Sequence, residues 1–203
     1  MPETVLDYDD LNEDYFDQIA DILLNHTYLL VNKKKYRLVE IEFYLNSNAH
    51  KDEYTHSNPD QLLMHTFYFH KYKTGTHKAG TYKGMDLTFG DAEASAYFGI
   101  LVRAIKPLEK GDIIEGPCKT VDQILKDYGV ESILDLTRGE NLDLFNNRLN
   151  FILVPDSTLD QQPICAGPRI GLSAKFPEYQ NRPYRYVIYR DRIKKQKTSL
   201  IGI

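Results

Sequence analysis

Apolar residues recur along the chain with two different periods, and the change of period separates the predicted elements. Over residues 10–24 they recur near helical spacing, and Asp10 with Glu13 has the pattern of an N-terminal capping pair, which predicts a helix. From residue 28 onward the period is two. Branched and aromatic residues fill 28–32 and 36–45 around a polar turn, so these segments predict a β-hairpin.

A second hairpin follows a polar stretch. Residues 46–58 have the composition of an exposed loop. Apolar runs at 66–70 and 85–89 then flank a turn rich in Gly and Lys over 71–83, which predicts two more paired strands.

The remaining elements are predicted as separate strands and one helix. Gly116 and Pro117 lead into a helix over 120–128, and Gly129 is expected to end it. Strands are predicted at 97–105, 150–154 and 184–189, and residues 163–171 are predicted as a loop that turns into a strand.

These elements predict an α+β fold, a single mixed domain with a curved, mainly antiparallel β-sheet core flanked by helices. The chain has 203 residues, of which 42% are hydrophobic, enough for one buried core. The domain is expected to span residues 1–203, with residues 1–14 forming a less ordered acidic N-terminus.

Charge is distributed unevenly although the net charge is only −4. Residues 1–20 hold seven acidic residues and no basic one, whereas residues 181–203 hold seven basic residues and one acidic one. The chain is acidic as a whole, but one face is expected to be basic.

Composition argues against membrane, redox and metal chemistry. No stretch approaches the roughly 18 consecutive apolar residues of a membrane span, and Met1 precedes acidic residues instead of a signal region, so we expect an intracellular monomer in the cytoplasm, nucleoid or nucleus with no membrane partner. Cys118 and Cys165 are the only cysteines and are predicted to be structural thiols. All six histidines lie between His26 and His77 without a metal-binding motif, so no metal and no other cofactor is expected.

The strand at 39–45 has two faces of different character. Alternation places Val39, Ile41, Phe43 and Leu45 on one face, which is expected to be core. The other face carries Glu40, Glu42 and Tyr44, and it is either a solvated sheet surface or part of a functional site.

Arg103 interrupts the strand 100–105, which is apolar on both faces as a strand buried on both sides would be. Because burying an unpaired charge is costly, the guanidinium is expected to lie near a carboxylate, either Glu42 or Glu40. A purely structural ion pair is the alternative to a catalytic one.

Several short sequence motifs occur along the chain, and their order is informative. Residues 15–24 form an opening helix, 39–45 read Val-Glu-Ile-Glu-Phe-Tyr-Leu, 55–57 read Thr-His-Ser, and 100–109 read Ile-Leu-Val-Arg-Ala-Ile-Lys-Pro-Leu-Glu. Shorter matches are Gly-Thr at 80–81, Gly-Met at 84–85, Gly-Pro with Lys119 at 116–119, Arg-Ile-Gly at 169–171 and Pro-Tyr-Arg-Tyr-Val at 183–187. Together they resemble the alkylpurine (3-methyladenine) DNA glycosylases of the single-domain, mixed α and β type, over residues 15 to about 189.

This resemblance implies a base-excision site. Glu42 would position and deprotonate the attacking water, Arg103 would hold that water and Glu42, and the backbone carbonyl of Ile170 would be a second water ligand. Tyr44 would stack on an extruded base, and His56 would hydrogen-bond the flipped nucleotide. No lysine occupies the position of a nucleophile, so the implied enzyme is a monofunctional glycosylase.

The resemblance also implies DNA, single-stranded or modified, as the partner. The expected DNA-contacting residues are Lys83, Lys119, Arg182 and Arg185. Lys83 stands where the family has its intercalating tyrosine, and no other wedge is identified from the sequence.

Four functions are therefore considered, in this order. The first is a DNA glycosylase that hydrolyses the N-glycosidic bond of a damaged or modified base, because a carboxylate can activate water while it stabilises positive charge on the sugar. The second is a noncatalytic nucleic-acid-binding module of the same fold. The third is a hydrolase of free nucleosides or other N-glycosides, and the fourth is an interaction protein that uses its acidic N-terminal helix.

Overall fold

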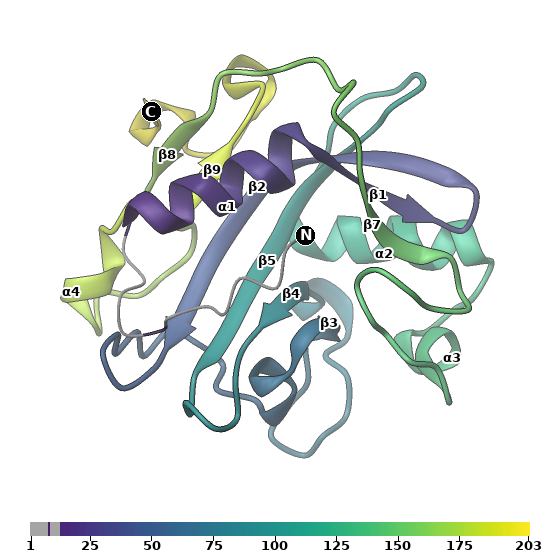
Figure 1. Cartoon of the computed structure of the whole chain (residues 1–203), viewed down its shortest axis with the longest axis horizontal. Helices are drawn as coiled ribbons and strands as arrows, with labels where there is room; N and C mark the ends of the chain where they lie inside the picture. The colour runs from purple at the N-terminus through teal and green to yellow at the C-terminus, as the bar shows by residue number, and fades with distance from the viewer. Residues whose placement is uncertain (1–7, 9–12) are drawn as a thin grey trace.

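The computed structural model, which describes Tyr8 and residues 13–203, has an α+β fold built on a ten-stranded sheet (Figure 1). Its strands are β1 (Thr27–Val31), β2 (Lys34–Asn46), β3 (Met64–Phe69), β4 (Met85–Phe89), β5 (Tyr97–Pro107), β6 (Ile114–Glu115), β7 (Phe151–Pro155), β8 (Cys165–Gly167), β9 (Arg185–Val187) and β10 (Ile201–Gly202). The helices are α1 (Glu13–Asn25), α2 (Pro117–Tyr128), α3 (Ile133–Thr137) and α4 (Pro177–Gln180), with 3-10 turns η1 (Pro59–Leu62), η2 (Gly80–Tyr82), η3 (Arg190–Arg192) and η4 (Lys197–Ser199).

The two longest strands, β2 and β5, form the centre of the sheet. They pair antiparallel from Tyr36 opposite Pro107 to Asn46 opposite Tyr97, with an irregular register around Glu40. The main path runs β10-β8-β9-β2-β5-β4-β3, so β9, from near the end of the chain, lies beside β2. Every strand pairing among the described residues is antiparallel, which confirms the predicted fold class.

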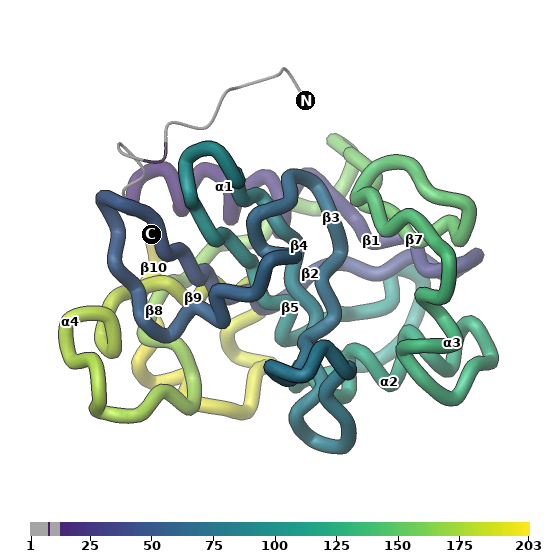
Figure 2. Tube along the Cα trace, turned by 90° about the horizontal axis from the view of Figure 1, so that it is seen from below, coloured from purple at the N-terminus to yellow at the C-terminus, as the bar shows by residue number. Residues whose placement is uncertain are grey.

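Helices α1 and α2 lie on opposite sides of the sheet (Figure 2). Phe16 of α1 stacks on Phe43 of β2 with ring centroids 4.7 Å apart, and it also contacts Phe98 and Tyr184. These rings cover the face predicted to be core, because Phe43 shares it with the other fully buried apolar residues of β2. The opposite face is left for α2 and for the polar side chains described below.

Both predicted hairpins are confirmed: β1 pairs with β2, and β3 pairs with β4. The helix predicted at 120–128 begins earlier, at Pro117, and Gly129 ends it in the left-handed conformation, with a φ of 68°. No helix of the described residues is long and apolar enough to cross a bilayer.

The predicted N-terminal helix is present from Glu13 onward, whereas residues 10–12 of the prediction lie outside the described residues. Of the acidic stretch 1–14, Glu13 and Asp14 form the first turn of α1. Tyr8 is buried and donates a hydrogen bond to the carbonyl of Phe89. The expectation of lower order for the rest of that stretch also concerns residues outside the described part.

Candidate active site

A row of side chains crosses the sheet on the face opposite α1. Glu42 of β2 pairs with Arg185 of β9 on one side and with Leu101 of β5 on the other. Leu101 in turn pairs with Asp86 of β4, and Asp86 pairs with Tyr68 of β3. Residues directly opposite one another point to the same face, and neighbouring strands are about 4.8 Å apart, which puts the backbones of Glu42 and Asp86 about 10 Å apart across Leu101.

The acidic face of β2 is buried. Glu40 and Glu42 are 1% and 0% exposed, so the interpretation of this face as a solvated surface is wrong. These two carboxylates contact Arg103, Arg185, Tyr44 and the backbone of Ile170. Carboxylates buried this deeply need positive partners and hydrogen-bond donors.

Two arginines supply the positive charge. Arg103 places Nε 3.1 Å from Oε1 of Glu40 and Nη1 3.3 Å from Oε2 of Glu42. Arg185 adds a 2.7 Å contact from Nε to the same oxygen of Glu40. The prediction that Arg103 needs a carboxylate is confirmed, and it uses both candidates instead of one.

Glu42 also receives two hydrogen bonds from uncharged groups. The backbone N–H of Ile170 donates to Oε1 at 2.7 Å, and the hydroxyl of Tyr44 donates to Oε2 at 2.8 Å. Burial raises the pKa of Glu42 even though Arg103 and these two donors favour its charged form. The carboxylate is therefore held in one orientation, with a proton affinity above that of an ordinary glutamate.

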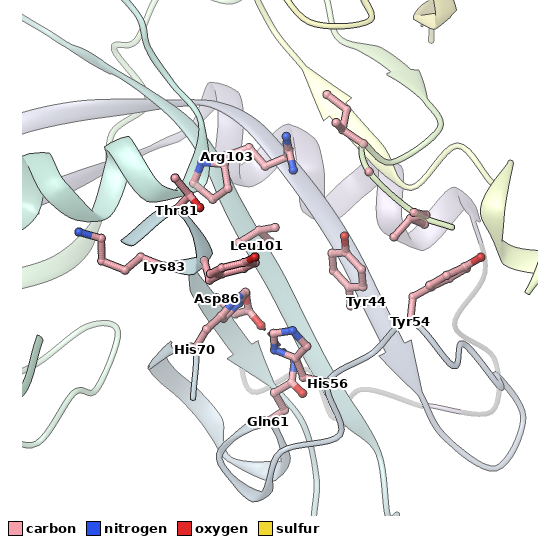
Figure 3. A pocket seen from close by; sticks show the side chains of 15 residues that line it. Tyr44, Tyr54, His56, Gln61, His70, Thr81, Lys83, Asp86, Leu101 and Arg103 are labelled. Carbon is pink, nitrogen blue, oxygen red and sulfur yellow. Dashed lines mark hydrogen bonds and ion pairs between the residues drawn. The ribbon is translucent and has the colours of Figure 1, made fainter. Parts of the chain in front are cut away.

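The three groups that hold Glu42 face a cavity of about 270 Å³. Tyr44, Arg103 and Ile170 all line it, and Glu42 lies directly behind them. In Figure 3 Leu101 lies between Tyr44 on one side and the pair of His70 and Asp86 on the other. The cavity thus has an apolar floor and two polar walls.

The second wall is a connected set of polar side chains from β4 and the loops around it. Asp86 accepts a 2.7 Å hydrogen bond from Nε2 of His70 and a 3.0 Å bond from Nε2 of Gln61. The ring of His56 lies 4.3 Å from that of His70, and Lys78 donates to Nε2 of His56 at 3.1 Å. Because a lysine can only donate, this contact puts the ring proton of neutral His56 on Nδ1.

His56 is the wall's most accessible imidazole. The pKa of His56 is lowered to about 4, mainly by desolvation and also by the neighbouring His70 and Lys78, while Asp86 opposes the shift. The ring is therefore neutral at pH 7 and offers a hydrogen-bond donor and a stacking surface without a charge.

Glycines make room for the second wall. A Cβ on Gly99 would lie 2.6 Å from Oδ2 of Asp86 and 2.7 Å from Nε2 of Gln61. A Cβ on Gly84 would lie 2.6 Å from the ring of His70. The second wall can pack against the sheet only because these two positions carry no side chain.

The four predicted DNA-contacting residues have different surroundings. Lys119 is exposed, and Arg182 is exposed and 3.2 Å from Glu13. Lys83 is largely covered and pairs with Asp122. Arg185 is 0% exposed, and its guanidinium is used by Glu40 and by the backbone carbonyls of residues 195 and 196, so its prediction as a DNA contact is wrong.

Lys119 belongs to a basic groove that the sequence did not define. The groove has a volume of about 400 Å³ and is lined by four basic residues, two acidic ones and Ile113: Lys119, Arg192, Lys194, Lys195, Asp112 and Glu115. Pro117 lines the cavity and Lys119 lines the groove, so the first turn of α2 lies between the two.

Ile170 lines the cavity and contacts Glu42, but not through the group that was expected to act there. Its N–H donates to Glu42, whereas the carbonyl was expected to hold water. The sequence left Tyr82 undecided between a base-stacking residue and a position on a solvated hairpin. Tyr82 lines the cavity from η2 and is 72% exposed, which only the folded turn reveals.

Metal ligation has no candidate cluster in the part of the chain that the structure describes. No three His, Cys, Asp or Glu side chains there are grouped to hold an ion. Both cysteines are free thiols.

Comparison with known proteins gives one full-length relative and no activity. No family model matches the chain. The chain is 52% identical over 205 residues to a protein called "Uncharacterized protein L759" of Acanthamoeba polyphaga mimivirus, and the alignment covers 96% of this chain and 95% of that protein. The alignment therefore spans nearly the whole of both chains.

We expect Gly99→Ala to destabilise the protein by about 1–3 kcal/mol, because the new methyl group would push Asp86 and Gln61 off the sheet. Chemical denaturation of both proteins measures the difference. Gly202→Ala is the matched control, since a Cβ there has no atom within 4 Å. Equal losses in the two variants would contradict the packing described for the second wall.

Proposed function

We propose that this chain, which belongs to one family with the mimivirus protein L759, is a monofunctional DNA N-glycosylase that removes a damaged or modified base flipped out of DNA. One observation carries the proposal: the buried carboxylate of Glu42 is held by Tyr44, Arg103 and Ile170, and all three line one cavity. The resemblance of strands β2 and β5 to those of the alkylpurine DNA glycosylases supports the same assignment.

The reaction breaks the bond between C1′ of the sugar and a base nitrogen, and the electron pair leaves with the base. Positive charge grows on the sugar, and the negative charge of Glu42 stabilises it. Water attacks C1′ and gives its proton to Glu42, which must lie within about 2.6–3.2 Å of that water. Tyr44 and Arg103 both line the cavity and both contact Oε2 of Glu42, so we assign the attacking water to the space beside these two side chains.

Arg103 is the group that keeps Glu42 usable as a base. Its second carboxylate partner, Glu40, is also held by Arg185, so two acids share two guanidinium groups. Burial raises the pKa of Glu42 toward the pH at which a general base works best. The charge of Arg103 acts the other way and favours the charged form of Glu42 in a site without bulk water.

The cavity suits one flat heterocycle. Its volume of about 270 Å³ is close to the lower limit of roughly 300 Å³ for small-molecule sites. Extruding a base costs about a few kcal/mol. Stacking on an aromatic ring stabilises an extruded base by about 1–3 kcal/mol. We assign this stacking to the rings of Tyr44 and His56.

The basic groove is the surface that we assign to DNA phosphates. Its exposed bases, Lys119, Arg192, Lys194 and Lys195, begin two residues from the cavity wall on α2. Lysines and arginines neutralise phosphates and release counterions, so binding to this groove weakens steeply with salt.

A hydrolase of free nucleosides is the second candidate. It is favoured by the internal engagement of Lys83 and Arg185, which leaves fewer basic side chains for a phosphate backbone. The chemistry at Glu42 would be the same, and only the size of the substrate would differ.

We expect Glu42→Gln to lower base release by about 10²–10⁴-fold, the usual contribution of a general base. Single- and double-stranded oligonucleotides with alkylated, deaminated and otherwise modified bases, together with the matching nucleosides, are incubated with each protein, and abasic sites or free bases are quantified. Glu53→Gln, on an exposed loop residue, is the control and should behave as wild type. Release of no base from any substrate by the wild type would refute the proposal, and release from nucleosides alone would select the second candidate.

The pH profile should have an acid limb set by Glu42. The base works only when ionised, so kcat/KM is expected to be high above the pKa of Glu42 and to fall as the pH drops through it. Burial places that midpoint above the ordinary value of 4.5. Tyr44→Phe removes a hydrogen bond that lowers this pKa, so it should move the limb to higher pH; a limb that stays at 4.5 or below in both proteins would exclude Glu42 as the base.

Tyr82 is the aromatic residue available to fill the gap that an extruded base leaves in a duplex. We expect Tyr82→Ala to lower base release from duplex by about tenfold or more, since apolar wedges offset about a few kcal/mol of unstacking. Release from single strands should change little. Tyr72→Ala, at an exposed tyrosine of the same long turn, is the control. Equal effects on both substrates would rule out a wedge.

A further inference from the structure

Asp86 is a charged group of the cavity that the hydrolytic step does not use. It lines the cavity and is only 2% exposed. It lies in the same cross-strand row as Glu42, with Leu101 between them. A flat base placed over Leu101 with its glycosidic bond toward Glu42 therefore presents its far edge to Asp86.

Asp86 has fewer donors than a buried carboxylate can take. Each of its oxygens accepts one hydrogen bond, from His70 or from Gln61, whereas a carboxylate offers about four acceptor positions. No lysine or arginine of the described residues forms an ion pair with it. Lys78 contacts His56, and burial lowers the pKa of Lys78 while the charge of Asp86 opposes that shift, but Lys78 and Asp86 do not form an ion pair. A hydrogen-bond donor on a ligand would therefore find a free acceptor position on the carboxylate of Asp86.

The carboxylate is also fixed before any ligand enters. Gln61 is anchored at both ends of its amide, because its Oε1 accepts from the backbone N–H of Asn58 while its Nε2 donates to Asp86. Gly99 lets this pair lie against β5, and Gly84 lets the ring of His70 lie against the backbone. A recognition group held on rigid elements discriminates between ligands better than one on a mobile loop.

We propose that Asp86 selects the substrate by accepting a hydrogen bond from an exocyclic amino group, so that the cavity takes amino-bearing nucleobases. The proposal rests on the proposed function in one respect, that a base enters this cavity. A site built around a buried acceptor rejects an analogue without the donor, because that acceptor then stays unpaired. Asp86 is thus a specificity residue, and Glu42 keeps the chemical step.

The test measures binding, which needs no catalysis. Calorimetric titration of the wild-type protein with 9-methyladenine and with 9-methylpurine, which lacks the amino group, gives an affinity ratio. We expect 9-methyladenine to bind about 10- to 100-fold more tightly, the usual range for a hydrogen bond to a charged group. In Asp86→Asn the ratio should fall about tenfold, because the amide accepts without a full negative charge.

The control is Asp60→Asn, which removes a carboxylate of η1 that pairs with Lys71 and does not line the cavity. It should keep the wild-type ratio. If Asp86→Asn fails to fold, the wild-type ratio decides: a ratio near one, or no binding of either compound, overturns the proposal. A ratio that survives in a folded Asp86→Asn protein overturns it as well.

The two proposals fail separately. Base release without any preference for amino-bearing bases would remove the role of Asp86 and leave the glycosylase intact. A preference in binding without base release from any substrate would leave Asp86 as a recognition group in a protein that only binds bases.

Discussion

Two glutamates and two arginines are buried together at the centre of the sheet, and the candidate site depends on the balance between their negative and positive charges. Glu40 and Glu42 occupy strand positions that in most sheets face solvent or carry apolar residues. Each is buried almost completely, and Arg103 bridges them while Arg185 closes the network from β9. Removing one partner from such a buried set usually costs about 3–5 kcal/mol, because the remaining charges cannot regain water. The network therefore constrains β2, β5 and β9 to one register.

That register brings the two walls of the cavity together. A strand has a side-chain period of two, so a slip by one residue would turn Glu42 and Asp86 to opposite faces. As the sheet is built, both carboxylates flank Leu101 and the helix α1 covers only the apolar face. The chemistry proposed for one side and the recognition proposed for the other both depend on the same strand pairing.

The sequence was sufficient to predict those elements and contacts that depend on local interactions or on a single strong physical rule. Periodicity predicted the two hairpins and α1, and the Gly116–Pro117 turn predicted α2. The cost of a lone buried charge predicted that Arg103 has a carboxylate partner. Short elements such as α4 are too brief to show a period. Arg185 was misjudged because it lies in a basic stretch, and only the pairing of β9 with β2 reveals that it faces Glu40. His70 and Asp86 belong to the predicted second hairpin, but Gln61 precedes it in the 3-10 turn η1, and only the folded chain shows that His70 and Gln61 both contact Asp86.

The position of β9 between β2 and β8 has a consequence for folding during synthesis. Residues 185–187 are synthesised well after β2 and β5, yet they must enter the middle of the sheet beside β2. Contacts of such long sequence separation form slowly, and domains generally fold as units. Until then Glu40 lacks one of its two arginines. The network of Glu40, Glu42 and Arg103 is therefore complete only once residues 185–187 have been made and have paired with β2.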